Sequence, residues 1–332
     1  MAKLAPQEKI VAVIGHYSSE MTATALAIYD RSGIPLINSS STSDELSSFD
    51  SIAFYRLTTL DLVNARHLIE MLAVHFSERA AVKVAIIYNH NSSYSKSCYQ
   101  ATVGNLERYS AQFTCLTPYP SLSADYYQVR EYLGEIDRQQ VDIVIIIADG
   151  GVEPNSLNNI GAIINRQNCW IVGSATLYQE NVLHWLDEQN AESISQIMAC
   201  VPWHWQSPTN GCQSKNITAR KFCQLGTHLW GKGNLTWRSA TAFDSASIVI
   251  DTLVRYQQRN NGVALQTSAA LLEQMDLAFK KGKQVVKGVT GQIKFDRSNG
   301  DRLDPPAEIV RVQYDPDRQK WQWTCDPQLL PK

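Results

Sequence analysis

The sequence predicts an α/β protein built from two doubly wound parallel-sheet lobes. Three observations lead to this prediction. The first is that short apolar runs alternate with helix-like segments along most of the chain, and the second is that most of these runs end in loops rich in Ser, Thr, Asn and Gly. The third is the length of the chain. The length of 332 residues is too great for most single-core domains and about right for two.

Composition narrows the function classes. Hydrophobic residues make up 44% of the chain, charged residues 19%, and the net charge is −2. Phosphate neutralisation needs clustered Lys and Arg, so a nucleic-acid partner is not expected. The longest apolar run, Ile143 to Ala148, is far short of the roughly 20 residues of a membrane span and is typical of a buried central strand.

The opening stretch, residues 11–46, has the pattern strand, turn, helix, strand. We expect a strand over Ile10–Ile14, a helix over Met21–Asp30 that Gly33 ends, and a second strand over Ile34–Ile37. Both strands are followed by hydroxyl-rich loops, HYSS and NSSSTS. In an open parallel sheet, the loops at the carboxyl ends of the strands line the ligand crevice. The two loops therefore predict a site for a small polar ligand.

The middle of the chain repeats strand, polar loop and helix, which predicts a second doubly wound unit. The expected strands are Val82–Tyr88, Phe113–Pro118, Val141–Ala148 and Trp170–Val172. The expected helices are Leu62–Phe76, Tyr99–Tyr109, Tyr126–Gln139 and Ser156–Arg166. Tyr94 is expected in the polar loop between Val82–Tyr88 and the helix that follows it.

The last third predicts helices without strands of their own. After a strand or crossover over Ile197–Trp205 and a polar loop, we expect helices over Ala219–Trp230, Ala240–Gln258 and Leu271–Phe279, a short strand over Gly288–Phe295, and a hairpin of Ile309–Tyr314 with Lys320–Thr324. We expect these helices to return to the first unit. The chain would then cross between lobes more than once, and the natural ligand site would be the cleft between them.

Cysteine usage leaves one question open. The seven cysteines are scattered, and no CxxC pair occurs, which argues against a zinc knuckle. Cys212 and Cys223 are separated by ten residues in a polar segment. A disulfide between them in an oxidising compartment and two free thiols are equal alternatives.

Four motifs carry a family resemblance: VAVIGHYSSEMT, GIPLINSSSTSDEL, FYRLTTLD and GVTGQIKFDRSNGDR. In this order and spacing the chain resembles the extracellular ligand-binding receptor family, the type I periplasmic binding proteins of the branched-chain amino-acid type. The resemblance implies a substrate-binding protein of an ABC transporter. Such a protein has no catalytic activity or cofactor, resides in the periplasm, binds an amino acid or similar small ligand, and partners with a permease in the membrane.

The resemblance also implies the limits of the two lobes, and it reveals one difference between this chain and the family pattern. Lobe 1 would comprise residues 1–57 and 203–290, and lobe 2 residues 58–202 and 291–332. Family members begin with a strand, helix and strand before the VIGH segment, and here that stretch is absent. Met1 to Lys9 resembles the tail of the missing helix, and it lacks the apolar core of a signal peptide. The first lobe is therefore expected to be incomplete at its N-terminus.

Site residues follow from the resemblance position by position. In lobe 1, Ser19 matches the position that holds the ligand carboxylate with a hydroxyl and a backbone N–H. Thr42 matches the hydroxyl that holds both ends of an α-amino acid, and Ser40 or Ser41 lies in the same loop. In lobe 2, Tyr94 lies in the loop from which, in the family, an aromatic residue closes over the ligand. Ala175 falls where many members place an acid for the α-ammonium group, and Asp149 could replace that acid. The predicted ligand-binding residues are Ser19, Ser40, Ser41, Thr42, Tyr94 and Asp149.

Structural roles compete with these assignments. Ser and Asn favour turns and helix N-caps, so the hydroxyl loops could be turn formers, and Asp149 could cap a helix. His16 has no recognisable acidic or Cys partner and is expected to be structural. Structural roles are also expected for Trp203 and Trp205 and for the Phe243–Asp244 pair.

Two alternative functions remain open. The same fold could serve as the ligand-sensing module of a signalling receptor. A hydrolase using Ser18 or Ser19 as nucleophile lacks a base and an oxyanion motif in the sequence.

Overall fold

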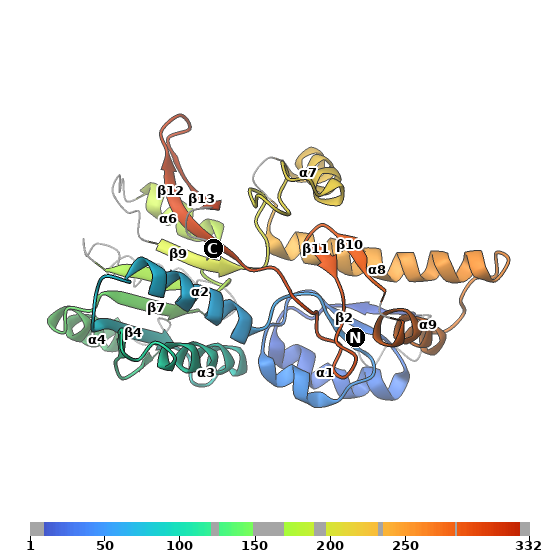
Figure 1. The fold of residues 1–332 in the computed structure, drawn as a ribbon, viewed down its shortest axis with the longest axis horizontal. Coiled ribbons are helices and arrows are strands. Elements are labelled where there is room, and N and C mark those ends of the chain that lie inside the picture. Colours follow the sequence, from blue (N-terminus) through green and yellow to red (C-terminus); the bar gives the residue numbers. More distant parts are fainter. Residues whose placement is uncertain are drawn as a thin grey trace. The chain divides into compact units, whose positions relative to one another are not determined.

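The computed structural model describes residues 10–120, 126–148, 169–188, 197–231, 235–282 and 284–325. The chain divides into two compact units. The first unit consists of Met1–Leu60 and Pro202–Pro306, and the second of Asp61–Val201 and Ala307–Lys332. Figure 1 shows the elements of both.

The first unit contains a parallel sheet in the order β1-β2-β3, formed by β1 (Val13–Ile14), β2 (Leu36–Asn38) and β3 (Phe54–Arg56). An antiparallel hairpin of β10 (Val286–Gly288) and β11 (Gly291–Ile293) lies apart from this sheet in the pairing order. The short strand expected over Gly288–Phe295 is thus part of a hairpin whose turn is Val289–Thr290.

The helices of this unit are α1 (Ser19–Ser32), the 3-10 helix η1 (Asp44–Phe49), α7 (Ile217–Trp230), α8 (Trp237–Arg259), α9 (Ser268–Met275) and the π-helix η2 (Asp276–Lys281). In Figure 1, α1 lies on one side of the sheet and α8 on the other, whereas α7 packs with β10. Successive strand residues point to opposite faces, and Leu36 packs with Leu26 and Tyr29 of α1 while Ile37 packs with residues of α8, α9 and η2. The late helices therefore complete the first unit, as the sequence predicts.

The second unit contains an eight-stranded sheet. Its order is β13-β12-β9-β8-β7-β4-β5, and β6 also pairs with β4. The strands are β4 (Val82–Tyr88), β5 (Phe113–Cys115), β6 (Tyr119–Pro120), β7 (Ile143–Ile147), β8 (Trp170–Gly173), β9 (Ile197–Val201), β12 (Glu308–Asp315) and β13 (Lys320–Cys325). β12 and β13 are antiparallel to their neighbours, and the other pairs are parallel.

Helices α2 (Asp61–His75), α3 (Ser93–Glu107), α4 (Tyr126–Arg138) and α6 (Glu180–Glu188) belong to this unit. Side chains of α2, α3 and the central strands form one core cluster that includes Leu72, Cys98 and Ile145. α6 was not expected from the sequence, and the expected helix Ser156–Arg166 lies outside the described residues. None of the helices in the described ranges is long and apolar enough to cross a membrane.

The segment 291–306 packs with the first unit, whereas the sequence predicted that it belongs to the second. Buried contacts explain the difference. Arg56 of β3 donates from its backbone N–H to the Gly300 carbonyl at 2.9 Å, and its Nε lies 2.8 Å from Asp301 Oδ1. Arg302 donates to the Leu57 carbonyl at 3.2 Å. These contacts join positions about 245 residues apart in sequence, which a local pattern does not reveal.

Candidate functional site

The loop between β1 and α1 ends in a helix cap. Ser18 has an extended backbone, and its Oγ accepts the Met21 N–H at 3.2 Å, so α1 begins at Ser19. The helix N-terminus presents backbone N–H groups and a partial positive charge at the carboxyl end of β1, where an anionic group would be stabilised. Ser19 is buried, and its Oγ accepts the Ser43 N–H at 3.4 Å. The two hydroxyl loops therefore touch each other.

Asn38 holds these loops together. It ends β2, is fully buried, and its Nδ2 lies 3.0 Å from the Gly15 carbonyl oxygen and 3.1 Å from both Thr22 Oγ1 and Ser41 Oγ. Its Oδ1 accepts the backbone N–H groups of Ser40 at 3.2 Å and Ser41 at 2.8 Å. Sequence reasoning assigned no role to Asn38. A polar residue as the last position of an apolar strand is the signal that would have found it, because a buried amide needs several partners.

The predicted loop residues differ in what their hydroxyls do. Ser41 Oγ lies 2.8 Å from Thr22 Oγ1 and donates to the His16 carbonyl at 3.2 Å, so Ser41 serves as an internal brace in this structure. The Ser40 side chain is half-buried, and the Thr42 side chain is buried. Neither the Ser40 nor the Thr42 hydroxyl makes a hydrogen bond with another residue that the structure describes. These two hydroxyls are thus available to a ligand.

The first turn of α8 lies against the same loops. Thr241 Oγ1 donates to the Ser39 carbonyl at 2.8 Å. One turn earlier, the Arg238 guanidinium carbon lies 5.0 Å from the centroid of the Tyr17 ring and 4.4 Å from that of Trp237. Because residues three apart lie on one side of a helix, Arg238 and Thr241 both face the loops that follow β1 and β2. Arg238 therefore lies beside Tyr17, in the loop that follows β1.

His16 has a structural environment. Its Nε2 lies 3.1 Å from the Tyr29 hydroxyl, and the two rings stack at 5.8 Å. Burial lowers the pKa of His16, which favours the neutral ring. The contact with Tyr29 occupies Nε2 of the ring, and within the described residues no hydrogen bond joins His16 to the hydroxyl of Ser18 or Ser19. The hydrolase hypothesis therefore gains no support from the geometry.

In the second unit, Tyr94 lies on the first turn of α3 instead of in the predicted loop. Ser92 caps the helix by accepting the Ser95 N–H at 3.2 Å, and this moves the helix start to Ser93. The Tyr94 hydroxyl donates to Ser174 Oγ at 2.8 Å and lies 3.4 Å from Thr176 Oγ1. Sequence reasoning assigned no role to these two hydroxyls, although they follow β8 at the same kind of strand end.

The Tyr94 hydroxyl keeps its proton at physiological pH. Burial raises its pKa well above the ordinary value, and the Cys98 thiol and the Asp61 carboxylate raise it further. The Tyr94 hydroxyl therefore supplies no negative charge, and its one proton is donated to Ser174 in this structure. Asp149, the predicted partner of an ammonium group, lies outside the described residues.

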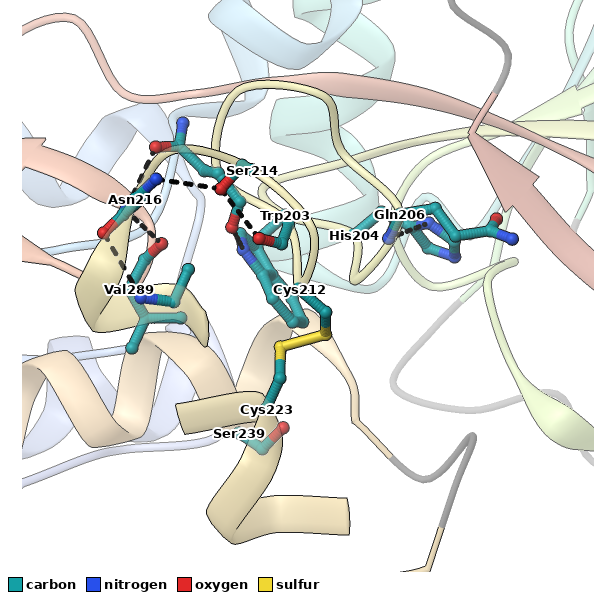
Figure 2. The surroundings of a disulfide bond; sticks show 12 residues. Trp203, His204, Gln206, Cys212, Ser214, Asn216, Cys223, Ser239 and Val289 are labelled. Atoms are coloured by element: carbon teal, nitrogen blue, oxygen red, sulfur yellow. Dashed lines mark hydrogen bonds between the residues drawn. A yellow bond between two sulfur atoms is a disulfide. The ribbon is translucent and has the colours of Figure 1, made fainter. Parts of the chain in front are cut away.

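The segment that enters the first unit after β9 is anchored by a disulfide (Figure 2). Cys212 and Cys223 are joined, which decides between the two alternatives for this pair. The bond ties the loop to α7. Within the loop, Trp203 donates from its indole N–H to the Asn210 carbonyl at 2.7 Å, and its ring packs against Phe222 at 5.9 Å. The predicted structural role of Trp203 is thus what the structure shows.

The loop is in turn tied to the β10–β11 hairpin. Asn216 Nδ2 donates to the carbonyls of Gly288 at 2.9 Å and Val289 at 3.1 Å, a contact visible in Figure 2. Asp244 of α8 accepts the N–H of Val289 at 2.6 Å and that of Thr290 at 2.9 Å. Thr290 Oγ1 accepts from Arg302 at 2.7 Å. These bonds link the segments that carry the chain into and out of the first unit.

Asp244 thus has the structural role expected for the Phe243–Asp244 pair. Burial raises its pKa, while its hydrogen bonds from Thr290 and Val289 and the nearby Arg302 guanidinium oppose that rise. Across the described residues, no group of three or more His, Cys, Asp or Glu side chains is arranged to hold a metal ion.

Comparisons with known proteins agree with this architecture. The family described as periplasmic binding protein matches residues 1–319. A search of curated protein sequences found no match. Among solved structures, a leucine binding protein LivK from Thermotoga maritima is similar with a TM-score of 0.71 and 16% identity, covering 99% of this chain and 84% of that one.

Two further structures widen the range of ligands seen in similar proteins. The substrate-binding protein LivJ from Streptococcus pneumoniae, in complex with isoleucine, has a TM-score of 0.70 and 17% identity, covering 98% of this chain and 82% of that one. A solute binding protein from R. palustris, in complex with 4-hydroxybenzoate, has a TM-score of 0.73 and 15% identity, covering 97% and 79%. At these identities the likeness shows the shared fold.

Proposed function

Because the chain belongs to the periplasmic binding protein family, we propose that it is the substrate-binding protein of an ABC transporter. Its ligand is an amino acid or a similar small carboxylic acid, and its partner is a permease in the membrane. Similar structures hold isoleucine and 4-hydroxybenzoate, which share a carboxylate. The family is a solute-binding one, and the proposal involves no catalytic step.

One observation supports this proposal most directly: two hydroxyl loops at neighbouring strand ends are held in contact by buried Asn38. The loop that carries Ser40 and Thr42 contacts the first residue of α1, because the Ser43 N–H donates to Ser19 Oγ at 3.4 Å. Hydroxyl and backbone N–H donors at a helix N-terminus suit a carboxylate. We assign Ser19, Ser40 and Thr42 to the ligand carboxylate, and Tyr94 to a hydrogen bond from the second unit.

We also propose that the protein is located outside the cytoplasm. The Cys212–Cys223 disulfide suits an oxidising compartment, since cytosolic thiols are kept reduced. We propose the periplasm, where the family acts.

Calorimetric titration of the protein with leucine, isoleucine and 4-hydroxybenzoate tests the function. We expect one class of ligand to bind, and Thr42→Val to weaken that binding about tenfold or more, because the loss of a hydrogen bond to a charged group costs about 1.5–3 kcal/mol. Thr227→Val, an exposed position on α7, is the matched control and should bind normally. Absence of binding to every member of the panel would reject the proposal.

Tyr94→Phe tests the second unit separately. The variant removes one hydroxyl that donates to Ser174 and keeps the ring. We expect weaker binding with the cooperative unfolding transition retained. Normal affinity in this variant would remove Tyr94 from the site while leaving the Thr42 result unaffected.

A further inference from the structure

The first unit contains a cavity of about 290 Å³ that is separate from the two hydroxyl loops. Three segments of the unit form its walls. The loop after β9 contributes Asn210, β11 and the residue after it contribute Gln292 and Lys294, and the segment that follows contributes Arg302 and Asp304. Ligand pockets in proteins measure about 300 to 1,000 Å³, so a cavity of this size suits a small molecule.

Backbone contacts hold the walls of this cavity in place. The Leu303 N–H donates to the Lys294 carbonyl at 2.8 Å, which joins the last segment to the end of the hairpin. Gly291 has a φ of 99°, and a Cβ at this position would lie 3.0 Å from Asn210 Oδ1. Glycine therefore allows the loop after β9 to approach the hairpin closely. A cavity that is formed in advance loses less entropy when it binds a ligand.

Two opposite charges line the cavity. Lys294 and Asp304 are exposed, and neither side chain forms an ion pair or a hydrogen bond with a residue in the described ranges. They do not pair with each other, so an ammonium group and a carboxylate remain available side by side in one cavity. Each charge alone would be an ordinary solvated surface group. The wall between them adds a third charge, which is buried.

That buried charge is Arg302, whose side chain is 3% exposed. Its two terminal nitrogens donate to the carbonyls of Leu57, Thr290 and Gln292 and to Thr290 Oγ1. Its Nε has no partner in the part of the chain that the structure describes. The Asp244 carboxylate reaches Arg302 through the Thr290 hydroxyl and not by direct contact. A buried cation without a direct counter-charge favours an anionic group at the adjoining surface.

We propose that this cavity is a second binding site and that it takes a small zwitterion, such as a free amino acid. The anionic group of the ligand lies toward Lys294 and the Arg302 wall, and its ammonium group lies toward Asp304. A ligand with a single charge would leave either Lys294 or Asp304 unmatched, which is why a zwitterion fits better than a simple anion. The inference does not depend on the proposed function, because the cavity and the hydroxyl loops share no residue.

Nuclear magnetic resonance of the labelled full chain tests the inference, because it reports where a ligand binds. Glycine and β-alanine are titrated to about 10 mM while the backbone amide signals of Gly291 and Gln292 are followed. We expect saturable changes with both zwitterions, and none with acetate or methylamine at the same concentrations. Lys294→Met and Asp304→Asn should each weaken the binding about tenfold or more, because each removes a hydrogen bond between charged groups.

Lys320→Met and Asp317→Asn are the matched controls. Both residues are exposed near the turn between β12 and β13 in the second unit, and both variants should bind like the wild type. An equal response to acetate would show a site for anions and overturn the inference. Unchanged hairpin signals with both zwitterions would also overturn it, and so would wild-type affinity in Lys294→Met or Asp304→Asn. Changes confined to residues 39–42 would report the candidate site alone and would likewise reject a second site.

Discussion

The buried side chain of Asn38 forms hydrogen bonds with both hydroxyl loops of the candidate site. Its amide donates to the β1–α1 loop and accepts from two backbone groups of the loop after β2. Every polar atom of the amide is thereby used, which is the condition for burying it without a large cost. Together with the Ser19–Ser43 and Ser41–His16 hydrogen bonds, Asn38 fixes the two hydroxyl loops against each other.

Replacing Asn38 should therefore destabilise the protein. We expect Asn38→Ala to lower the free energy of unfolding by about 2–3 kcal/mol, because it leaves the buried Ser41 N–H and its neighbours without their partner. Urea unfolding followed by circular dichroism measures the change. Ser40→Ala is the control and should change the value by less than about 0.5 kcal/mol. Equal effects in the two variants would contradict the role assigned to Asn38.

His204 makes the stability depend on pH. It is fully buried, and burial lowers its pKa to about 3. Between pH 6.5 and about 3, the unfolded chain binds a proton at this ring that the folded protein excludes. The free energy of unfolding must therefore fall as the pH falls through this window, by up to about 1.4 kcal/mol per pH unit.

Comparing two pH values isolates this contribution. Between pH 6.5 and 4.5 the wild type should lose about 2 kcal/mol more stability than His204→Gln, because all other titrating groups are shared by both proteins. Urea unfolding at each pH provides the four values needed. Identical losses in the two proteins would show that His204 is not the group responsible.

At the scale of elements, the loop after β9 and the β10–β11 hairpin have little regular structure to support them. Their stability comes from specific contacts instead. A disulfide joins the loop to α7, Asn216 donates hydrogen bonds to the hairpin, and Asp244 accepts hydrogen bonds from the hairpin turn. A cross-link of this kind acts largely by restricting the unfolded chain.

Reducing the disulfide should show how much it contributes to the free energy of unfolding. Cys212 and Cys223 are 11 positions apart, and closing a loop of this length stabilises a protein by about 3 kcal/mol. We expect dithiothreitol to lower the urea unfolding free energy of the wild type by about this amount. The double variant Cys212→Ser/Cys223→Ser should begin at the lower value and not respond to dithiothreitol. A response of that variant would implicate another cysteine.

At the scale of the whole molecule, each unit is assembled from segments far apart in the chain. In the first unit, the Arg56–Asp301 pair joins β3 to the segment by which the chain leaves that unit. Arg56 is fully buried and also donates to the Ser43 carbonyl at 2.7 Å and to Ser47 Oγ at 2.9 Å. Among the described residues, the ion-pair partner of Arg56 is Asp301.

Asp301→Ala should consequently be strongly destabilising. We expect a loss of about 3–5 kcal/mol in the free energy of unfolding, because the variant leaves a buried cation without its counter-charge. Lys281→Ala provides the contrast, since it breaks an exposed pair with Asp276 and should cost less than about 1 kcal/mol. Urea unfolding of both variants measures the difference, and comparable losses would refute the importance of burial.

Much of the architecture could be predicted because it is encoded locally. Strand β4 has the limits that its apolar run predicts, and Gly33 ends α1 in the left-handed conformation, with a φ of 61°, that glycine adopts at low cost. The order of strands, polar loops and helices was enough to predict two α/β lobes. Helix starts were less certain, as α3 shows, because a cap depends on one side chain such as Ser92.

The candidate site was predictable only in part. The sequence by itself determined which loops carry hydroxyls, since these follow apolar runs at strand ends. The tertiary structure decided that Ser41 turns inward to Thr22, that Asn38 braces both loops, and that Arg238 lies beside Tyr17. Residues 22, 38, 41 and 238 come together through packing between segments, and the direction of a hydroxyl or guanidinium is set by partners that periodicity and spacing do not specify.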